Sequence, residues 1–406
     1  MNILEDLKKR GIFNNITNEK KFMSLKKGEG VYIGFDPTAK SLHLGNYLQI
    51  ATLLRFKKFG FKPIAVLGGA TAMIGDPSGK SSERILLDNK QIEINKKHIK
   101  KELESFGLKV IDNYDFYKNM NVLTFMRDIG KLLNVNYMIN KDVVASRLET
   151  GISFTEFSYQ LIQGWDFKIL YEKNNIKLQV GGSDQWGNIT SGIEIIRKVL
   201  GDDNQAVGIT TNLLTTASGK KFGKSEGNAL WLNKQMTSPF ELYQYLLNTP
   251  DQDVEQILKW ATLLSLDKIE SIMQKHKKEP FKRYSQKQLA LEVTGQIHSS
   301  EEAKGAVKIS EVLFSKGDVS DLTLNQALQL EGSVPTFEKI KGNILDALIS
   351  IKAAKSKREA REFVQGHAIE VNGIKVDSEY FEIKPGFSGK AAIIKKGKKS
   401  FYLIKY

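Results

Sequence analysis

Residues 31–46 decide the fold, and they read VYIGFDPTAKSLHLGN. The run begins with apolar residues, which predict a buried β-strand that ends near Gly34. Pro37 then enforces a turn, because proline fixes its own φ and has no backbone N–H to donate. A helix begins near Ser41. A strand, a tight turn and a helix in this order indicate the first unit of an α/β sheet.

The same alternation continues through the first half of the chain. Apolar runs predict strands at Val31–Phe35, Pro63–Leu67, Lys109–Ile111 and Leu178–Val180. Amphipathic stretches predict helices at Leu42–Phe59, Asp88–Phe106, Val122–Leu133 and Glu156–Glu172. The alternation favours a Rossmann-like α/β fold, a doubly wound parallel sheet with helices on both faces. Such sheets bind ligands outside the carboxyl ends of their strands, where several glycines of this chain fall.

Composition excludes several classes of protein. A hydrophobic fraction of 41% in 406 residues is enough to bury a core. The chain has no cysteine, which excludes disulfides, thiolate catalysis and cysteine-based zinc sites. Its 5 histidines are far apart and form no metal-ligand spacing, so we expect no protein-bound metal.

The formal net charge of +14 favours a polyanionic partner such as nucleic acid, although a basic excess can also serve solubility alone. No stretch approaches the ~18 uncharged apolar residues that span a bilayer, and the amino terminus lacks the apolar core of a signal peptide. We therefore expect a cytoplasmic protein without a membrane partner.

The second half of the chain has a different organisation. Consecutive helices are predicted from about Ser238, at Phe240–Leu247, Val254–Leu264, Leu266–His276 and Ser285–Ile297. A polar stretch without clear periodicity follows and predicts a linker. We expect a Rossmann-like domain at 1–225, an α-helical domain at 226–320, a linker at 321–337 and a small α+β domain at 338–406. Residues 334–406 contain 15 Lys and Arg against 8 Asp and Glu, which is half of the net charge.

Residues 75–81, GDPSGKS, resemble a phosphate-binding P-loop. Only three residues separate the glycines, however, where a P-loop needs four. Pro77 also removes one N–H from a loop whose purpose is to present them. A P-loop ATPase is therefore disfavoured.

Two other motifs form a specific pair. His43 and Asn46 lie on the first turn of one helix, where the helix N-terminus favours anions. Residues 219–225, GKKFGKS, set two lysines beside a glycine, which suits a loop that closes on a triphosphate. Alone, these motifs could be a capped helix and a solvated basic turn. In this order they resemble the His-Ile-Gly-His and Lys-Met-Ser-Lys-Ser signatures of class I aminoacyl-tRNA synthetases.

Two further segments narrow the resemblance. Tyr159, Gln163 and Asp166 follow one helical stripe, and buried polar groups so aligned need partners. A purely structural network is the alternative. Residues 181–188, GGSDQWGN, set an acid and an amide at a strand end. Together these segments resemble bacterial-type tyrosyl-tRNA synthetases, and the resemblance covers essentially the whole chain.

The resemblance implies roles for individual residues. The tyrosine substrate would be held by Tyr32, Asp76, Tyr159, Gln163, Asp166 and Gln185, with Tyr32 and Asp166 at its phenol. ATP would be bound by Gly34, Asp36, His43, Gly182, Asp184 and Lys224, accompanied by Mg²⁺. The catalytic groups around the phosphates would be Thr38, His43, Asn46, Lys221, Lys224 and Ser225. Two positions depart from the family, because Ile33 stands where many members carry cysteine and Asn46 replaces the second histidine of the signature.

The carboxyl-terminal region resembles the S4 RNA-binding module. Basic side chains gather at one predicted helix start, and a second basic group lies in a predicted hairpin at 395–399. The tRNA contacts implied are Lys355, Lys357, Arg358, Arg361, Lys396 and Lys398. A merely solvated run of charge is the alternative.

The resemblance implies an ATP-dependent tyrosine–tRNA ligase with L-tyrosine, ATP and the tRNA for tyrosine as substrates. It also implies a homodimer, for which Val122–Ile139 is the candidate interface. An RNA-binding protein derived from a synthetase is a non-enzymatic alternative, since residues alone do not report turnover.

Overall fold

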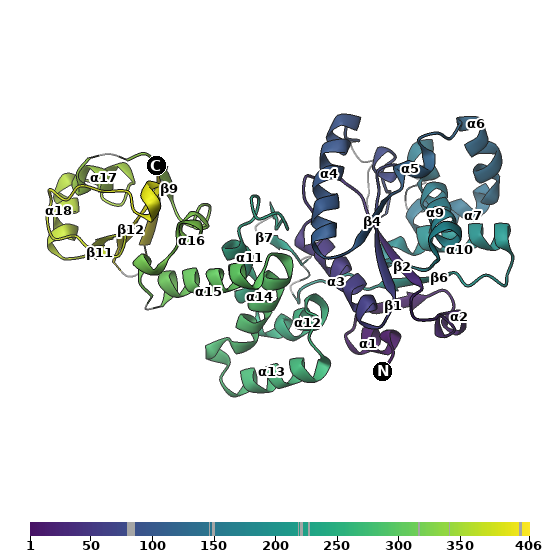
Figure 1. Cartoon of the computed structure of the whole chain (residues 1–406), viewed down its shortest axis with the longest axis horizontal. Helices are drawn as coiled ribbons and strands as arrows, with labels where there is room; N and C mark the ends of the chain where they lie inside the picture. The colour runs from purple at the N-terminus through teal and green to yellow at the C-terminus, as the bar shows by residue number, and fades with distance from the viewer. Residues whose placement is uncertain are drawn as a thin grey trace. The chain divides into compact units, whose positions relative to one another are not determined.

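The computed structural model describes the chain except residues 79–85, 146, 148–150, 218, 220–221, 226–227, 316, 341 and 398–399, and except the side chains of residues 142–143, 224–225 and 228. The described residues divide into two compact units (Figure 1). The first unit is Met1–Asn233 with Gln252–Gln274, and the second unit is Lys234–Asp251 with Lys275–Tyr406.

Among the described residues, one six-stranded sheet forms the centre of the first unit. Its order is β1-β6-β5-β2-β3-β4, and every pair is parallel except β1 with β6. The strands are β1 (Phe13–Ile16), β2 (Gly30–Phe35), β3 (Lys62–Leu67), β4 (Lys109–Asp112), β5 (Ile176–Gly182) and β6 (Val207–Thr211). The expected parallel α/β sheet is confirmed, and β1 and β6 are strands that the sequence analysis did not predict.

Helices cover both faces of this sheet, with α3 and α4 on one side and α9 and α10 on the other (Figure 1). Their bounds are α3 (Leu44–Lys58), α4 (Asn89–Ser105), α9 (Phe154–Asn174) and α10 (Trp186–Leu200). The strands between them are apolar because both faces are covered, and all residues of β6 are buried. Shorter helices are α1 (Ile3–Lys9), α2 (Glu19–Met23), α5 (Tyr114–Tyr117), α7 (Val135–Ile139) and α8 (Asp142–Ala145).

Residues 122–133 differ from the single helix that we expected. They form α6 (Val122–Thr124), a π-helical turn (Phe125–Ile129) and a 3₁₀ turn (Gly130–Leu132). Glycine weakens a regular helix, and here it lies where one type of turn gives way to the next. Apolar side chains are left on the surface, with Leu123 74% exposed.

Helix α3 is held at its carboxyl-terminal half by Arg55. The guanidinium donates to the carbonyl oxygens of Lys259, Trp260 and Thr262 at 2.9, 2.6 and 2.6 Å. These carbonyls lie at the end of α12 (Asp251–Ala261), where a helix leaves its last acceptors unpaired. Burial, together with the positive charge of Arg10, lowers the pKa of Arg55 to about 9. The contact fixes α3, whose other end carries His43.

The second unit combines helices with a small sheet. The helices are α11 (Pro239–Leu247), α14 (Tyr284–Ile297), α15 (Ser300–Phe314), α16 (Leu324–Leu328), α17 (Ile344–Ser350) and α18 (Lys357–Gln365), while α13 (Leu266–Lys278) extends into it. The sheet order is β11-β10-β12-β13-β9, from β9 (Thr336–Glu338), β10 (Ile369–Val371), β11 (Ile374–Lys375), β12 (Ala391–Lys396) and β13 (Ser400–Lys405). Both the run of helices and the small α+β domain are confirmed.

The stretch 321–337, which we expected to be a linker, contains regular structure. It includes α16 and the start of β9.

Of the helices in the described part of the chain, none is long and apolar enough to cross a membrane.

Candidate active site

The start of α3 is built by His43 and Asn46. His43 Nδ1 accepts the backbone N–H of Asn46 at 3.2 Å, and Asn46 Oδ1 accepts the backbone N–H of His43 at 3.1 Å. This reciprocal cap satisfies two donors that a helix start leaves unpaired. A Cβ on Gly45 would lie 2.9 Å from His43 Cε1, so glycine leaves room for the imidazole. The two signature side chains therefore lie side by side at the helix N-terminus.

The loop of the second signature motif lies against this helix start. Gly223 has a φ of +87°, and a Cβ there would lie 2.9 Å from the backbone nitrogen of Gly45. Leu230 N–H donates to Gly223 O at 3.1 Å. The structure thus brings the two motifs together. Lys221 and the side chains of Lys224 and Ser225 lie outside the described residues.

Buried polar side chains surround Asp166 of α9, which is 3% exposed. Asn113 Nδ2 donates to Asp166 Oδ2 at 2.8 Å, and Tyr117 Oη lies 2.6 Å from Asp166 Oδ1. Tyr32 of β2 is also buried, and its hydroxyl has no hydrogen-bond partner among the described residues. A buried hydroxyl without a partner costs about 1–3 kcal/mol, so its presence near a buried carboxyl indicates that a polar ligand group completes the cluster.

The cluster holds its protons at neutral pH. Burial raises the pKa of Asp166 to about 8; hydrogen bonds that the ionised carboxylate would accept from Tyr117 and Asn113 lower it, and the charge of Asp36 raises it. Burial, aided by the charge of Asp166, also raises the pKa of Tyr32 well above its usual value. An uncharged set of donors and acceptors suits a neutral ligand group such as a phenol.

The polar stripe of α9 leads from this cluster to Asp36. Tyr159 Oη donates to Asp36 Oδ2 at 3.1 Å, and Thr71 Oγ1 donates to Asp36 Oδ1 at 2.7 Å. A side chain at Gly68 would collide with both partners of that second bond. Gln163 is half-buried on the same helix. We expected Asp36 to bind ATP. Its contact with Tyr159 also links it to the residues that we expected to bind tyrosine.

A second carboxylate, Asp76, is bound by amides from the end of β5 and the start of α10. Gln185 Nε2 donates to Asp76 Oδ2 at 2.7 Å, and Asn188 Nδ2 donates to Gln185 Oε1 at 3.1 Å. At the same strand end, a Cβ on Gly182 would lie 2.5 Å from Asp184 Oδ1, so glycine lets this carboxylate approach the backbone. Gly34, near the end of β2, and Thr38, on the turn after it, are exposed to solvent.

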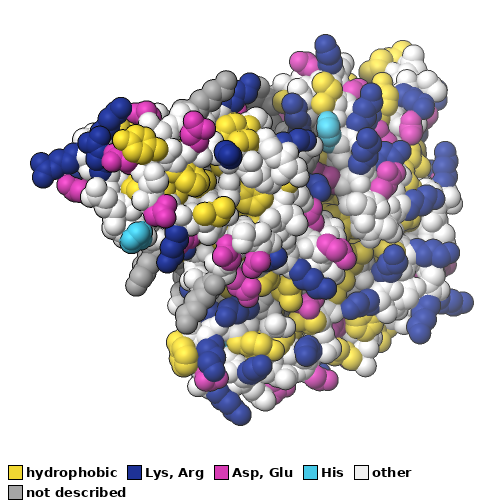
Figure 2. Space-filling model, turned by 60° about the vertical axis from the view of Figure 1, so that its left-hand side comes forward, with side chains coloured by type: hydrophobic (Ala, Val, Ile, Leu, Met, Phe, Trp, Pro, Cys, Tyr) yellow, Lys and Arg dark blue, Asp and Glu magenta, His cyan; other side chains and the backbone are white. Residues whose placement is uncertain are grey.

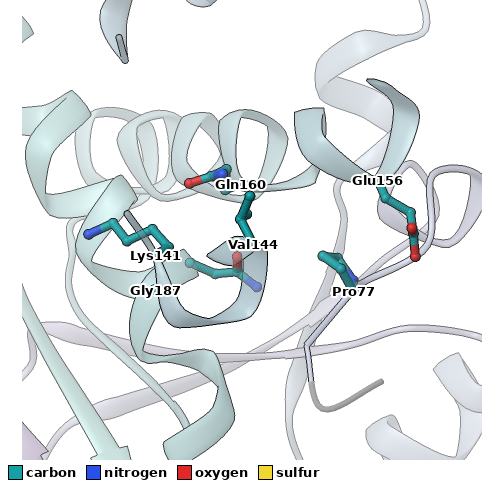
Figure 3. A pocket seen from close by; sticks show the side chains of 7 residues that line it. Pro77, Lys141, Val144, Glu156, Gln160 and Gly187 are labelled. Atoms are coloured by element: carbon teal, nitrogen blue, oxygen red, sulfur yellow. The ribbon is translucent and has the colours of Figure 1, made fainter. Parts of the chain in front are cut away.

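A small pocket lies beside Pro77, the residue after Asp76 (Figure 3). Pro77, Gln160 and Gly187 are among the residues that line it, and its volume is about 10 Å³. That space fits about one water molecule and is far too small for an amino acid. Lys141, at one end, donates to Tyr137 Oη at 2.8 Å. We therefore do not regard this pocket as a substrate site; it is a small gap in the packing beside α9 and α10.

Three of the six basic residues expected to contact RNA have acidic partners within the second unit. Nitrogen–oxygen distances are 2.8 Å for Lys357–Asp346, 3.3 Å for Arg358–Glu362 and 2.6 Å for Arg361–Glu379. Lys396 Nζ donates to Ala353 O at 2.6 Å, while Lys355 lies just before α18. Lys398 lies outside the described residues. Figure 2 shows Lys and Arg spread over the visible face of the molecule.

Sequence reasoning missed Asn113, Tyr117, Thr71 and Asn188 as members of these clusters. One signal was available for Asn113, since it lies two residues after the predicted strand at 109–111, and ligand groups collect at strand ends. Over the described residues, no group of three or more His, Asp or Glu side chains could hold a metal ion.

Comparison with known proteins first defines the class. The family model for class I tRNA synthetases of tryptophan and tyrosine matches residues 26–315, and the model for the carboxyl-terminal domain of tyrosine–tRNA ligases matches residues 326–404. The fold is therefore that of a class I aminoacyl-tRNA synthetase, an enzyme that uses ATP as a substrate.

Relatives identify the member of that class. The chain is 51% identical to the tyrosine–tRNA ligase of Mycoplasmopsis agalactiae and 50% identical to that of Mycoplasmopsis synoviae, over 99–100% of each chain. A truncated mitochondrial tyrosyl-tRNA synthetase from Aspergillus nidulans has a TM-score of 0.70 at 31% identity, covering 77% of this chain and 94% of that one. The chain belongs to the tyrosine–tRNA ligase family.

Proposed function

We propose that this site activates L-tyrosine with ATP and then charges tRNA. The tyrosine carboxylate attacks the α-phosphorus of ATP, the bond to the bridging oxygen breaks, and pyrophosphate leaves tyrosyl-adenylate behind. The 3′-terminal ribose hydroxyl of the tRNA then attacks the acyl carbon and releases AMP. No side chain needs to form a covalent intermediate, so rate acceleration comes from positioning and electrostatics.

The observation that supports this proposal best is the buried polar cluster of Asp166 and Tyr32. In it, Tyr32 donates to the oxygen of the substrate phenol, and the phenol donates to Asp166. Phenylalanine would leave the Tyr32 hydroxyl buried without a partner, which is the physical basis for rejecting it.

The remaining polar groups suit the two charged ends of tyrosine. Asp76, Tyr159 and Gln163 bind the ammonium group, and Gln185 binds the carboxylate through its amide. The hydrogen bond between Gln185 and Asp76 supports this division, because it orients the amide while the carboxylate supplies the charge.

ATP would lie at the start of α3. Gly34, Asp36, Gly182 and Asp184 bind the nucleoside side. Around the phosphates are Thr38, His43, Asn46, Lys221, Lys224 and Ser225. The close packing of Gly223 on Gly45 supports this arrangement, since it brings the lysine loop to the helix N-terminus that favours anions. Mg²⁺ would accompany the phosphates and neutralise part of their charge.

We propose that the tRNA is bound by the second unit. Phosphates would be contacted by Lys355, Lys357, Arg358, Arg361, Lys396 and Lys398. The acidic partners found there imply that RNA phosphates compete with carboxylates, and a surface ion pair is worth only about 0–1 kcal/mol. We keep the division into a catalytic domain at 1–225, a helical domain at 226–320, a linker at 321–337 and a small domain at 338–406.

We also propose that the protein is a cytoplasmic homodimer. Exposed apolar side chains gather between residues 122 and 135, where Val122, Leu123 and Val135 are 69%, 74% and 58% exposed. Such patches are uncommon on monomers and mark protein–protein contacts. Residues 122–139 are the candidate interface.

Tyrosine-dependent exchange of labelled pyrophosphate into ATP tests the proposed activity. We expect exchange with tyrosine and almost none with phenylalanine. Tyr32→Phe removes one hydroxyl and should relax the discrimination by roughly 1–3 kcal/mol. Unchanged selectivity in this variant would remove Tyr32 from the phenol site, and a complete lack of exchange would favour an RNA-binding protein without activity.

A further inference from the structure

Tyr117 belongs to the buried polar cluster around Asp166 and Tyr32, although no sequence motif includes it. It comes from α5, and its hydroxyl oxygen touches two acceptors of α9, lying 2.6 Å from Asp166 Oδ1 and 2.8 Å from the carbonyl oxygen of Ile162. Both distances are those of good hydrogen bonds. A tyrosine hydroxyl has only one proton, however, so it can donate in only one of these contacts.

The hydrogen-bond donors around Asp166 can be counted, because the orientation of the neighbouring Asn113 amide is known. Ala70 N–H donates to Asn113 Oδ1 at 2.7 Å, so the amide nitrogen of Asn113 must face the other way and donates to Asp166 Oδ2 at 2.8 Å. Asp166 Oδ1 is then left facing Tyr117. The carbonyl of Ile162 is an acceptor only, so both contacts of Tyr117 can be hydrogen bonds only when its proton goes to Ile162.

The contact between Tyr117 and Asp166 then requires a proton from Asp166. A neutral carboxyl group can donate it, so that both contacts are hydrogen bonds. With an ionised Asp166, Tyr117 would donate to Oδ1, and its 2.8 Å contact with the Ile162 carbonyl would hold no hydrogen. Burial and the charges of Asp36 and Asp112 all favour the neutral form, which agrees with a pKa of about 8. The other groups that face Asp166 are Asn113 and Tyr32, neither of which carries charge.

We propose that Tyr117 is a positioning residue of the tyrosine site: it donates to the Ile162 carbonyl, accepts the proton of Asp166, and thereby leaves Asp166 Oδ2 to accept the proton of the substrate phenol. This role rests on the proposed function of the site. It concerns only substrates that carry a phenol, because phenylalanine has no proton to offer Asp166.

The test compares Tyr117→Phe with the control Tyr114→Phe. The control also removes one tyrosine hydroxyl from α5, but its ring lies under Lys96 Nζ and outside the cluster. Pyrophosphate exchange gives kcat and KM for tyrosine and for phenylalanine. In Tyr117→Phe the proton of Asp166 has lost its acceptor. It can then turn toward the substrate, where it competes with the phenol proton for the same hydrogen bond. We therefore expect KM for tyrosine to rise about 10-fold, with kcat changing much less and the phenylalanine constants unchanged.

The outcomes separate positioning from simple structural support. Equal losses for tyrosine and phenylalanine would show a loosened pocket and overturn the proposal, as would an unchanged KM for tyrosine. Tyr114→Phe should behave as the wild type in every assay. Binding of tyrosine alone, measured by calorimetry, should weaken by the same factor in Tyr117→Phe. If the wild-type protein itself showed no exchange, the proposed function would fail, and the binding measurement would still decide the role of Tyr117.

Discussion

Replacing Asp166 with asparagine should stabilise the substrate-free protein, and the gain should grow with pH. Burial raises the pKa of Asp166 to about 8, while an aspartate in an unfolded chain has a pKa of about 3.9. At a pH between these two pKa values, Asp166 has lost its proton in the unfolded chain but keeps it in the folded protein. Stability from this group is therefore fully present below about pH 4 and is lost as pH rises toward 8.

The two pKa values set the size of the effect. One pKa unit corresponds to about 1.4 kcal/mol, so keeping Asp166 protonated costs about 1.5 kcal/mol of stability at pH 5 and about 4 kcal/mol at pH 7. Asparagine has no such proton, yet its amide can donate to Tyr117 and accept from Asn113 as the neutral acid does. The difference between the two proteins should widen by about 2–3 kcal/mol from pH 5 to pH 7, or about 5–10 °C in Tm for a large domain.

Thermal unfolding of both proteins without ligands, at several pH values from 5 to 7, measures this difference. Asp115→Asn is a matched control, because it removes a carboxylate from the surface of α5, where the side chain is 61% exposed. Its Tm difference from the wild type should not widen with pH. A constant or narrowing difference for Asp166→Asn would refute the reasoning, because it would mean that Asp166 ionises as readily in the folded protein as in the unfolded chain.

Three further predictions concern other parts of the molecule. Lys224→Ala should lower kcat of pyrophosphate exchange about 10²–10³-fold with little change in tyrosine binding; weaker tyrosine binding as the main effect would contradict its role at the phosphates. Ending the chain after Val334, before β9, should preserve exchange but abolish tRNA charging and flatten the salt dependence of tRNA binding. Leu123→Asp should yield monomers in sedimentation, whereas Met23→Asp, at another exposed apolar position, should not.

The fold was largely predictable because its signals are local. The strand, turn and helix at 31–46 form as the pattern predicts, with β2 ending at Phe35 and α3 beginning at Leu44. The pairing of β1 with β6 was not predictable in the same way. It joins Phe13 to Thr211, and contacts between segments so distant leave no periodicity in either one.

The site was predictable only where a motif carries it. The signature pair could be found by its spacing, and Asp166 by its position on a polar helical stripe. Tyr117 has no such pattern, because it meets Asp166 through the packing of α5 against α9. A four-residue helix with no fully buried side chain of its own gives no amphipathic signal that would orient its tyrosines.

The asparagine in place of the second signature histidine has a consequence that only the structure reveals. His43 Nδ1 accepts the backbone N–H of Asn46, so this nitrogen carries no proton, and in the neutral imidazole the proton must lie on Nε2. Asn46 uses its oxygen to cap the backbone of His43, which leaves its amide nitrogen as the remaining donor. The cap therefore converts two side chains that can each donate or accept into two hydrogen-bond donors. Donors at a helix N-terminus suit phosphate groups, so under the proposed function the cap would retain the chemistry of the signature although one of its residues can never carry charge.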